Sequence, residues 1–267
     1  MNAWQLTLKT KVASSLDASR ICLSDWTGLS TAEIAGLQLP SVHAGPALSV
    51  GDVFSIVTLP LDSPAIVIVG DVSFLDFLGR KHSGGLLRVE GDVGNYCAAE
   101  TRGGWVQVTG STGHHLGSTT GASTRGMNGG RVEVGGSTGD YAGHRMRRGE
   151  IFIDGDAGSL AASNMIAGTV AVAGDVGRYA ALAMRRGSLV VRSVEIAAAG
   201  RWTDSIEVCS QYPALVRFDS GPVAACLTPK VRRLFRSLCR TPFLSRRGDE
   251  SVSGQGEMIG PRAVSSH

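Results

Sequence analysis

The 267-residue chain has no long hydrophobic run, few aromatic residues and few lysines. It contains neither a run of about 18 apolar residues nor a charged leader followed by an apolar segment, so it predicts neither a membrane span nor secretion. Its five cysteines are scattered and form no C-x-x-C pair, which is typical of reduced thiols in a cytosol. We therefore expect a cytoplasmic protein, with neither a membrane nor a nucleic acid among its partners.

The motifs of the common catalytic and nucleotide-binding sites are also missing. There is no Ser-His-acid set, no H-x-H, no P-loop and no Rossmann fingerprint. The adjacent His114 and His115 have no Cys or acid at ligand spacing, and neighbouring side chains in an extended segment point to opposite sides. We therefore expect histidines that are either satisfied polar groups or partly buried, no catalytic residue, no metal site and no cofactor bound by this chain alone.

Glycine, in contrast, is abundant, and much of it belongs to a repeat. Between Ile66 and Arg192 an apolar-x-apolar-x segment followed by a glycine turn occurs seven times, with a period of 19 residues and one insertion of seven. Two apolar positions two residues apart are typical of a strand with one buried face. The first of these positions is occupied by Ile66, Leu87, Val106, Val132, Ile151, Val170 and Leu189. The period predicts an all-β solenoid of about seven coils, with one parallel strand in each coil.

The turns repeat as G-D-x-G or as Ser-Thr-Gly. Asp71, Asp92, Asp156 and Asp175 recur in them, which resembles a cation site at first sight. The chain lacks the nine-residue GGxGxD frame of calcium-binding repeats, however. We expect turn caps instead, with Asp or Ser bonding the backbone two residues further on and glycine supplying positive φ.

Two further columns run along the repeat. One is predicted to form a packed corner stack and contains Leu75, Tyr96, His115, Tyr141, Leu160 and Tyr179. The other contains the candidate binding residues Arg102, Arg147 and Arg185, with Arg148 and Arg186 beside it. These five arginines indicate either a solvated basic ridge or a docking strip for an acidic partner surface or a polyanionic ligand.

Departures from the repeat suggest where partners bind. Phe152, Ala171 and Val190 fall on the outward face of their strands, and we expect them to form an interface. The seven-residue insertion falls within residues 114–130 and should bulge from the wall, where inserted loops tend to carry contacts.

The pattern divides the chain into four parts. Residues 1–50 form an amino-terminal cap, with a strand at Leu6–Leu8 and a capped helix beginning at Ser30. Residues 51–200 form the parallel β-helix. Residues 201–240 form cap strands, suggested by Trp202, Val208, Tyr212 and Val216, and an amphipathic helix after Thr228. Residues 241–267 are polar and rich in Gly and Ser, so we expect a flexible or partner-ordered tail.

The serial G-D-x-G turns resemble the right-handed parallel β-helix found in the C-terminal part of glutamate synthase large subunits and in the C-type subunit of formylmethanofuran dehydrogenase. The segments LTLK, STAEIAGLQLP and VGDVF, at residues 6–9, 30–40 and 50–54, make the chain more similar to the second group. The resemblance covers roughly residues 1–200. Because arginine dominates over lysine and the chain has a long extension, it looks like the bacterial branch, the C-type subunit of the formyltransferase/hydrolase complex of aerobic methylotrophs.

This resemblance implies a role in one-carbon metabolism and formaldehyde oxidation. Such a complex moves a formyl group from tetrahydromethanopterin to a methanofuran-type carrier and releases formate. The implied partners are an amidohydrolase-like subunit, a formyltransferase subunit and an oxidoreductase-like subunit. Zinc, or a molybdenum or tungsten pterin in relatives, is implied on those partners, whereas this chain is implied to be a scaffold without an active site.

Two alternatives remain open. One is a glutamate-synthase-like structural subunit that links two active sites. The other is a carbohydrate-active β-helix enzyme, which would need clustered outward acids on one wall. The outward acids of this repeat are dispersed, so the sequence favours the scaffold subunit.

Overall fold

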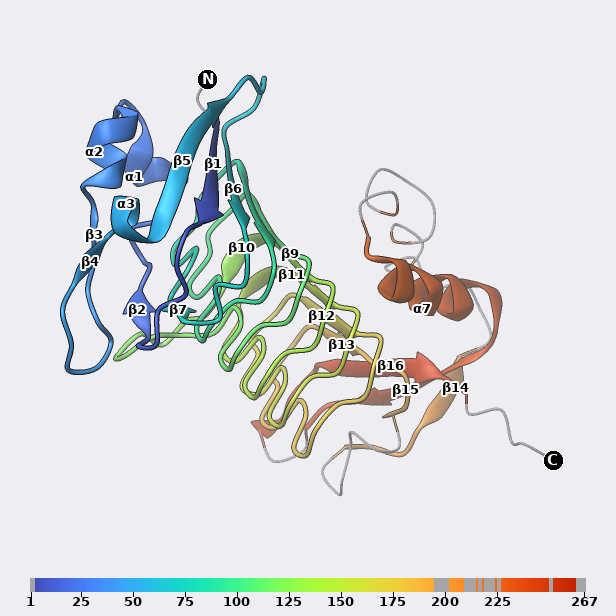
Figure 1. Ribbon diagram of the computed structural model, residues 1–267. Coiled ribbons are helices and arrows are strands. Elements are labelled where there is room, and N and C mark those ends of the chain that lie inside the picture. Colours follow the sequence, from blue (N-terminus) through green and yellow to red (C-terminus); the bar gives the residue numbers. More distant parts are fainter. Residues whose placement is uncertain are drawn as a thin grey trace.

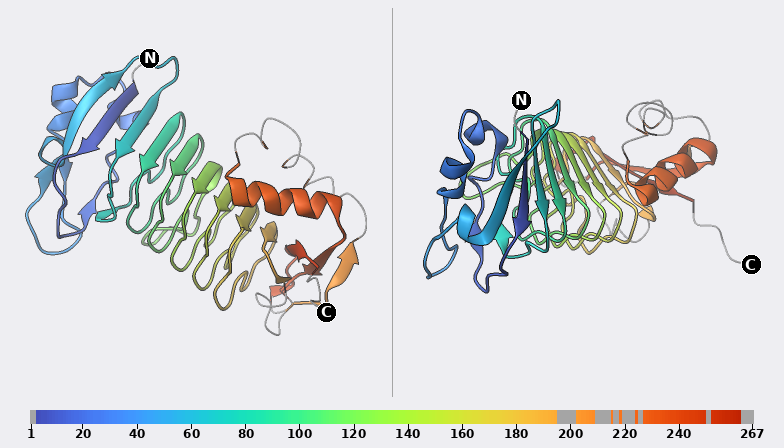
Figure 2. Two further views of the ribbon diagram at one scale, coloured as in Figure 1. Left: turned by 45° about the vertical axis from the view of Figure 1, so that its right-hand side comes forward. Right: turned by 45° about the horizontal axis from the view of Figure 1, so that its top comes forward.

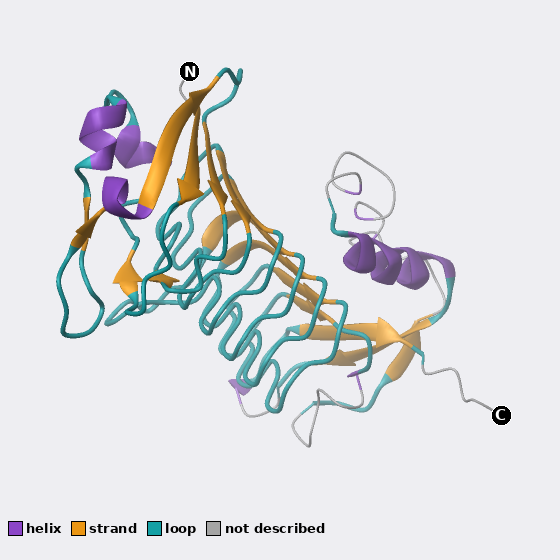
Figure 3. Cartoon of the chain, in the orientation of Figure 1, coloured by secondary structure: helices purple, strands orange, loops and turns teal. Residues whose placement is uncertain are grey.

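The computed structural model describes residues 3–194, 202–208, 215, 218, 224, 227–249 and 252–262. Its main feature is a mostly parallel sheet of 12 strands, in the order β14-β15-β16-β13-β12-β11-β10-β9-β8-β6-β1-β5 (Figure 1). The chain returns to this sheet once per repeat, so the strands lie side by side while the rest of each repeat is loop and turn (Figure 3). This mostly β architecture is compatible with the β-helix that the repeat predicts.

Seven strands follow one another at the repeated positions and pair in parallel. They are β6 (Ala65–Val69), β8 (Leu86–Glu90), β9 (Trp105–Val108), β10 (Asn128–Val134), β11 (Arg148–Ile153), β12 (Thr169–Val172) and β13 (Ser188–Val190). The register places Val106 opposite Val132 and Ile151 opposite Val170, as the apolar columns predict. These side chains are fully buried, and burial of such aliphatic columns is the main term that stabilises the stack.

The turn caps connect neighbouring coils, which differs from the expected local caps. Asp92 Oδ1 accepts the Ser111 N–H of the next coil at 2.7 Å, and Asp156 Oδ1 accepts that of Asp175 at 2.8 Å. Asp71 instead bonds two residues on, to the Ser73 N–H at 3.0 Å. Most of these turns therefore support the coil that follows.

The glycines of these turns are required mostly for space, which corrects the expectation of positive φ. A Cβ on Gly174 would overlap Asp156 Oδ1, and one on Gly155 would overlap Ser137 Oγ. Neither glycine has positive φ, although Gly70 and Gly91 do. A side chain at the turn would collide with the capping group of the coil before it.

The amino-terminal segment closes one end of the stack. β1 (Ala3–Leu8) pairs in parallel with β6 and antiparallel with β5 (Phe54–Leu59). The other elements of this segment are α1 (Leu23–Trp26), α2 (Thr31–Ala35), α3 (Val50–Val53), β2 (Leu16–Asp17), β3 (Gln38–Leu39) and β4 (Leu48–Ser49). The segment also contacts the short strand β7 (Leu75–Asp76) of the first coil. The capping box of Ser30 and Glu33 at α2 is confirmed.

The segment VGDVF does not begin the solenoid, because it forms the short helix α3 rather than a repeat turn. Ser49 and Asp52 cap that helix reciprocally. The strand that follows, β5, runs antiparallel at the edge of the sheet, so the repeated parallel strands begin at β6.

Over the described residues 243–249 and 252–261 the carboxyl-terminal tail is ordered by the chain itself, unlike the flexible or partner-ordered tail expected there. β16 (Glu257–Pro261) pairs in parallel with β13, and Met258 extends the inward column at Leu189. β15 (Phe243–Arg247) then pairs antiparallel with β16, and β14 (Ile206–Val208) forms the outer edge. The expected strand residues Tyr212 and Val216 lie outside the described residues.

The predicted amphipathic helix is confirmed as α7 (Pro229–Arg240), and it covers the outward face of the later strands (Figure 2). Phe152, Ala171 and Val190 are fully buried in a second apolar cluster with the helix, so the expectation of an exposed interface there is wrong. The Phe152 ring packs edge-on against Phe235, with 6.1 Å between ring centroids. An apolar stripe on one strand face thus has its partner within the same chain.

In the described parts of the chain, no helix combines the length and apolar character that crossing a membrane requires.

Candidate functional site

The aromatic column forms a stack along one corner of the coils. The rings of Phe77, Tyr96, His115 and Tyr141 lie nearly parallel, with centroids 4.5 to 4.8 Å apart. This spacing matches the distance between neighbouring strands, so one ring per coil suffices to continue the stack. Phe77, not Leu75, begins the stack, because the first repeat is two residues longer and turns Leu75 into the core.

His114 and His115 have separate structural roles. His115 lies in the stack between Tyr96 and Tyr141. Its burial lowers its pKa, and repulsion from His114 lowers it further. His114 Nδ1 accepts the Asp140 N–H at 2.9 Å, and its own N–H donates to Asn95 Oδ1 at 2.9 Å. His114 is thus one step in a second ladder of bonds between coils. Both histidines are engaged as the sequence predicted.

The five candidate arginines lie on the wall between the aromatic stack and the strands. Equivalent backbone bonds to the preceding coil place Arg102, Asn128, Arg147, Ile166 and Arg185 in one column. An arginine therefore occupies every second coil, and neighbouring arginines of the column are separated by about 10 Å along the stack. Arg148 and Arg186 follow directly in the chain.

Solvent reaches these arginines. Arg102, Arg148, Arg185 and Arg186 are exposed and Arg147 is half-buried. Among the described residues, none of the five guanidinium groups makes an ion pair or a side-chain hydrogen bond. An unpaired exposed guanidinium keeps its five donors available for a carboxylate or phosphate group.

We define the basic wall as residues 77–86, 96–104, 115–130, 141–149, 160–168 and 179–187. It contains nine Lys or Arg side chains and a single acid, Glu100. The whole chain has 26 Lys or Arg and 23 Asp or Glu, so 17 basic and 22 acidic side chains remain elsewhere. Positive charge is therefore concentrated on this one wall.

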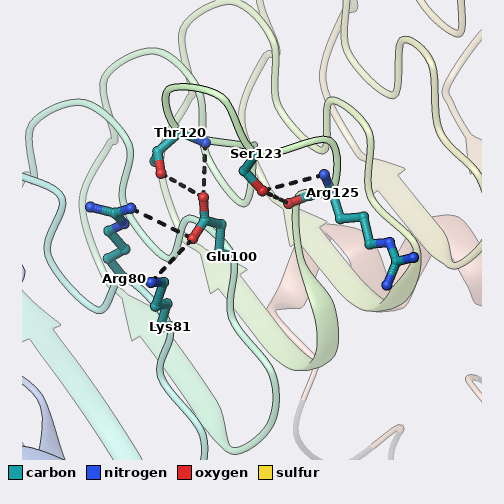
Figure 4. A network of polar contacts seen from close by, with 6 residues as sticks. All are labelled: Arg80, Lys81, Glu100, Thr120, Ser123 and Arg125. Atoms are coloured by element: carbon teal, nitrogen blue, oxygen red, sulfur yellow. Dashed lines mark hydrogen bonds and ion pairs between the residues drawn. The ribbon is translucent and has the colours of Figure 1, made fainter.

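Glu100 holds the inserted loop against the basic wall (Figure 4). Its carboxylate accepts hydrogen bonds from the N–H of Thr120 at 3.1 Å and from the Thr120 hydroxyl at 2.5 Å. Arg80 and Lys81 lie 3.7 and 4.0 Å from its other oxygen. Partial burial alone would raise the pKa of Glu100, but the Thr120 bonds and the two cations outweigh it and lower the pKa. An ionised Glu100 thus fixes the loop.

The inserted loop supplies one of these nine cations, Arg125, at the edge of the wall. Gly117 and Met127 close the loop through a backbone bond of 2.8 Å, and Gly126 is bonded to the Arg145 carbonyl at 3.0 Å. Ser123 Oγ donates to the Arg125 carbonyl at 3.0 Å, and the Arg125 side chain is exposed. The loop is therefore pinned at several points while its arginine remains accessible (Figure 4).

Two buried acids on the strand side were missed by sequence reasoning. Glu133 is fully buried beside Gln107 and Arg131, and burial raises its pKa to about 7 despite the nearby Arg131 charge. Asp154 accepts the N–H groups of Lys230 and Val231, at 3.0 and 2.8 Å, and so caps α7. Both acids occupy outward positions of the repeat, where the sequence predicts exposed side chains. Lys230, which donates to Asp154, follows it by 76 residues in the chain, so no local pattern connects the two.

Two cavities lie at the two ends of the stack. One of about 830 Å³ lies at the carboxyl end between β13 and the turn before β16, with Arg247 and Glu257 in its lining. Another, of about 560 Å³ and more apolar, lies at the amino end beside Trp4 and Leu23. Neither includes one of the five arginines. In the described residues no group of three or more His, Cys, Asp or Glu side chains is placed to hold a metal ion.

These features define the class of protein: a mostly β chain with a long parallel sheet, capped at both ends, that presents one basic wall. No protein-family model matches the chain, and no curated protein matches it either.

A solved structure is similar to it, however: the X-ray crystal structure of the formyltransferase/hydrolase complex (FhcABCD) from Methylorubrum extorquens in complex with methylofuran. A chain of that complex is 29% identical to this chain, and the match covers 97% of this chain and 99% of that one, with a TM-score of 0.73. The similarity thus extends over nearly the full length of both chains.

Proposed function

We propose that this chain is a non-catalytic structural subunit of a formyltransferase/hydrolase complex. The observation that carries the proposal is the match to a chain of such a complex over 97% of this chain at 29% identity. A shared fold alone would not imply a shared role, because one fold hosts many functions. Here the match extends over nearly the full length of both chains, which supports a shared role as a subunit.

In this proposal the complex transfers a formyl group between tetrahydromethanopterin and a methanofuran-type carrier and releases formate. The partners are an amidohydrolase-like subunit, a formyltransferase subunit and an oxidoreductase-like subunit. Metal chemistry would take place on those subunits, and this chain would contribute a rigid surface on which they assemble.

We also propose that the solenoid is a right-handed β-helix of about seven coils. Parallel strands of one sheet are joined by right-handed crossovers in about 98% of cases. The regular order of β6 and β8–β13 supports one coil per repeat.

The five arginines Arg102, Arg147, Arg148, Arg185 and Arg186 are the proposed contact residues for an acidic partner surface or for an acidic carrier. The carrier alternative can be measured separately. If the carrier binds there, neutralising Arg147, Arg148, Arg185 and Arg186 raises its KM in the assembled complex. An unchanged KM would exclude this alternative.

Purification of the tagged chain from its native cell, followed by mass spectrometry, tests the proposed function. We expect a formyltransferase subunit and an amidohydrolase-like subunit to co-purify in fixed proportion, and the eluate to convert a formyl carrier to formate. A chain that purifies alone, or with subunits of another activity, would contradict the proposal.

A further inference from the structure

Both ends of the solenoid are closed by the chain itself. β1 and β5 cover the first coil, and β5 pairs antiparallel at the edge of the sheet. At the other end β16 continues the stack, and the Asp249 carboxylate accepts the Ala183 N–H at 2.7 Å, where earlier coils use a backbone carbonyl of the next coil. Segments of the chain itself therefore occupy both positions where a further coil would stack, and the walls are the remaining large surfaces.

The outward face of the parallel strands, which we call the strand wall, is largely covered or paired within the chain. α7 covers the later strands, and its contact residues are buried on both sides of the junction. On the earlier strands, outward charges are paired with their neighbours: Arg88 bonds Glu90 at 3.0 Å, and Arg131 bonds Glu150 at 2.8 Å. Few groups on this wall are left to attract a partner.

The basic wall is different in both respects. No helix lies over it in the described structure. Arg80 pairs with Glu100, but the five candidate arginines make no ion pair or side-chain hydrogen bond with the described residues. Apolar side chains accompany the charges: the half-buried Ile166 separates Arg147 from Arg185, and Tyr179 at the corner is 63% exposed. Arginine and tyrosine with adjacent aliphatic groups are the composition of the energetically dominant centre of protein interfaces.

Resting on the proposed role as a subunit, we propose that the basic wall docks on an acidic face of a partner subunit, with Arg147 and Arg185 as the central contacts. A protein surface fits better than a small polyanion, because the arginines lie about 10 Å apart on a wall and not in either end cavity. Charge complementarity of this kind raises the association rate and selects the partner. The inserted loop with Arg125 adds contacts at the edge of the same surface.

Charge reversal in the full chain tests this assignment. The double variant Arg147→Glu/Arg185→Glu, called the wall variant, is compared with the double variant Arg233→Glu/Arg240→Glu, called the α7 variant. The α7 variant reverses two exposed arginines on α7, outside the wall. Each variant is expressed in place of the wild type, and its Kd for the remaining subunits is measured by biolayer interferometry at two salt concentrations. We expect the wall variant to weaken binding at least tenfold and to flatten the salt dependence, and the α7 variant to change Kd less than threefold.

Circular dichroism shows whether each variant is folded, and we expect unchanged spectra because Arg185, Arg233 and Arg240 are exposed and Arg147 is half-buried. Equal losses in the two variants, or no loss in the wall variant, would overturn the proposal. So would a wall variant that still assembles but no longer binds poly-L-glutamate, since the wall would then be a polyanion site. A different outcome separates the two proposals: the wild type assembles with subunits of another activity, and the wall variant does not bind them. That result would support the basic wall as a docking surface and contradict the proposed formyl-transfer function.

Discussion

The strand wall of the later coils and the basic wall belong to the same coils and are separated by only a few residues of chain. On the strand wall, Phe152 and Val190 are fully buried under α7, and Asp154 caps that helix. On the basic wall, Arg147 and Arg185 have no partner among the described residues. The apolar exceptions of the repeat therefore stabilise the chain itself, whereas its charged exceptions remain available to other chains.

The largest expected effect is on the strand wall. Phe152→Ala should lower the free energy of unfolding by about 3 to 5 kcal/mol, because it empties a buried contact with Phe235 and removes the ring beneath Arg131. Chemical denaturation measures this. Tyr179→Ala on the corner of the basic wall is the matched aromatic control, with an expected loss below about 0.5 kcal/mol because that ring is exposed. Similar losses at both sites would refute the contrast.

Glu133 makes the strand wall sensitive to pH. Burial raises its pKa to about 7, so between about pH 4.5 and 7 the unfolded chain loses a proton that the folded chain keeps. The wild type should therefore lose stability across this window, whereas Glu133→Gln has no proton to lose. The stability of the variant relative to wild type should rise by about 3 kcal/mol from pH 4.5 to pH 8. A difference that stays constant across these pH values would show that Glu133 is not held in its protonated form.

The attachment of α7 depends on an acid supplied by the turn after β11. Asp154→Ala should cost about 1 to 2 kcal/mol, because the first N–H groups of the helix lose their acceptor and the helix dipole loses its counter-charge. Asp154→Asn retains an acceptor and should cost less. Thermal unfolding measures both variants, and an Asp154→Ala variant as stable as the wild type would mean that the cap contributes nothing.

The smallest expected effect is on the basic wall. Arg147→Ala should change the free energy of unfolding by less than about 0.5 kcal/mol, because this guanidinium makes no ion pair or side-chain hydrogen bond with the described residues. Arg131→Ala on the strand wall is the control, with an expected loss of about 2 kcal/mol from its two bonds to Glu150. A destabilised Arg147→Ala variant would place that arginine among the structural residues.

The repeat could be predicted because its signal is local and occurs seven times. Alternating apolar positions specify the strands, and the apolar stripe after Thr228 specifies α7 as a helix. The stack at Tyr96, His115 and Tyr141 follows from the same period. The arginine column could be predicted for the same reason, since a residue repeated at the period lies on one line.

What could not be predicted depends on contacts between distant segments. β16 is short and contains Gly260 and Pro261, so it has no strand signal of its own and becomes ordered by pairing with β13. The burial of Phe152 requires knowing that α7 returns to the strand wall. The sequence shows an apolar stripe on that helix and another on the strands, but no local signal indicates that the two pack against each other.

In the proposed arrangement, partners bind to the basic wall and not to the α7 side. Arginine footprinting with phenylglyoxal, read by mass spectrometry on the free chain and on the assembled complex, separates these two possibilities. We expect Arg147 and Arg185 to react in the free chain and to become protected on assembly, while Arg233 reacts equally in both. Protection of Arg233 with Arg147 and Arg185 still reactive would contradict it.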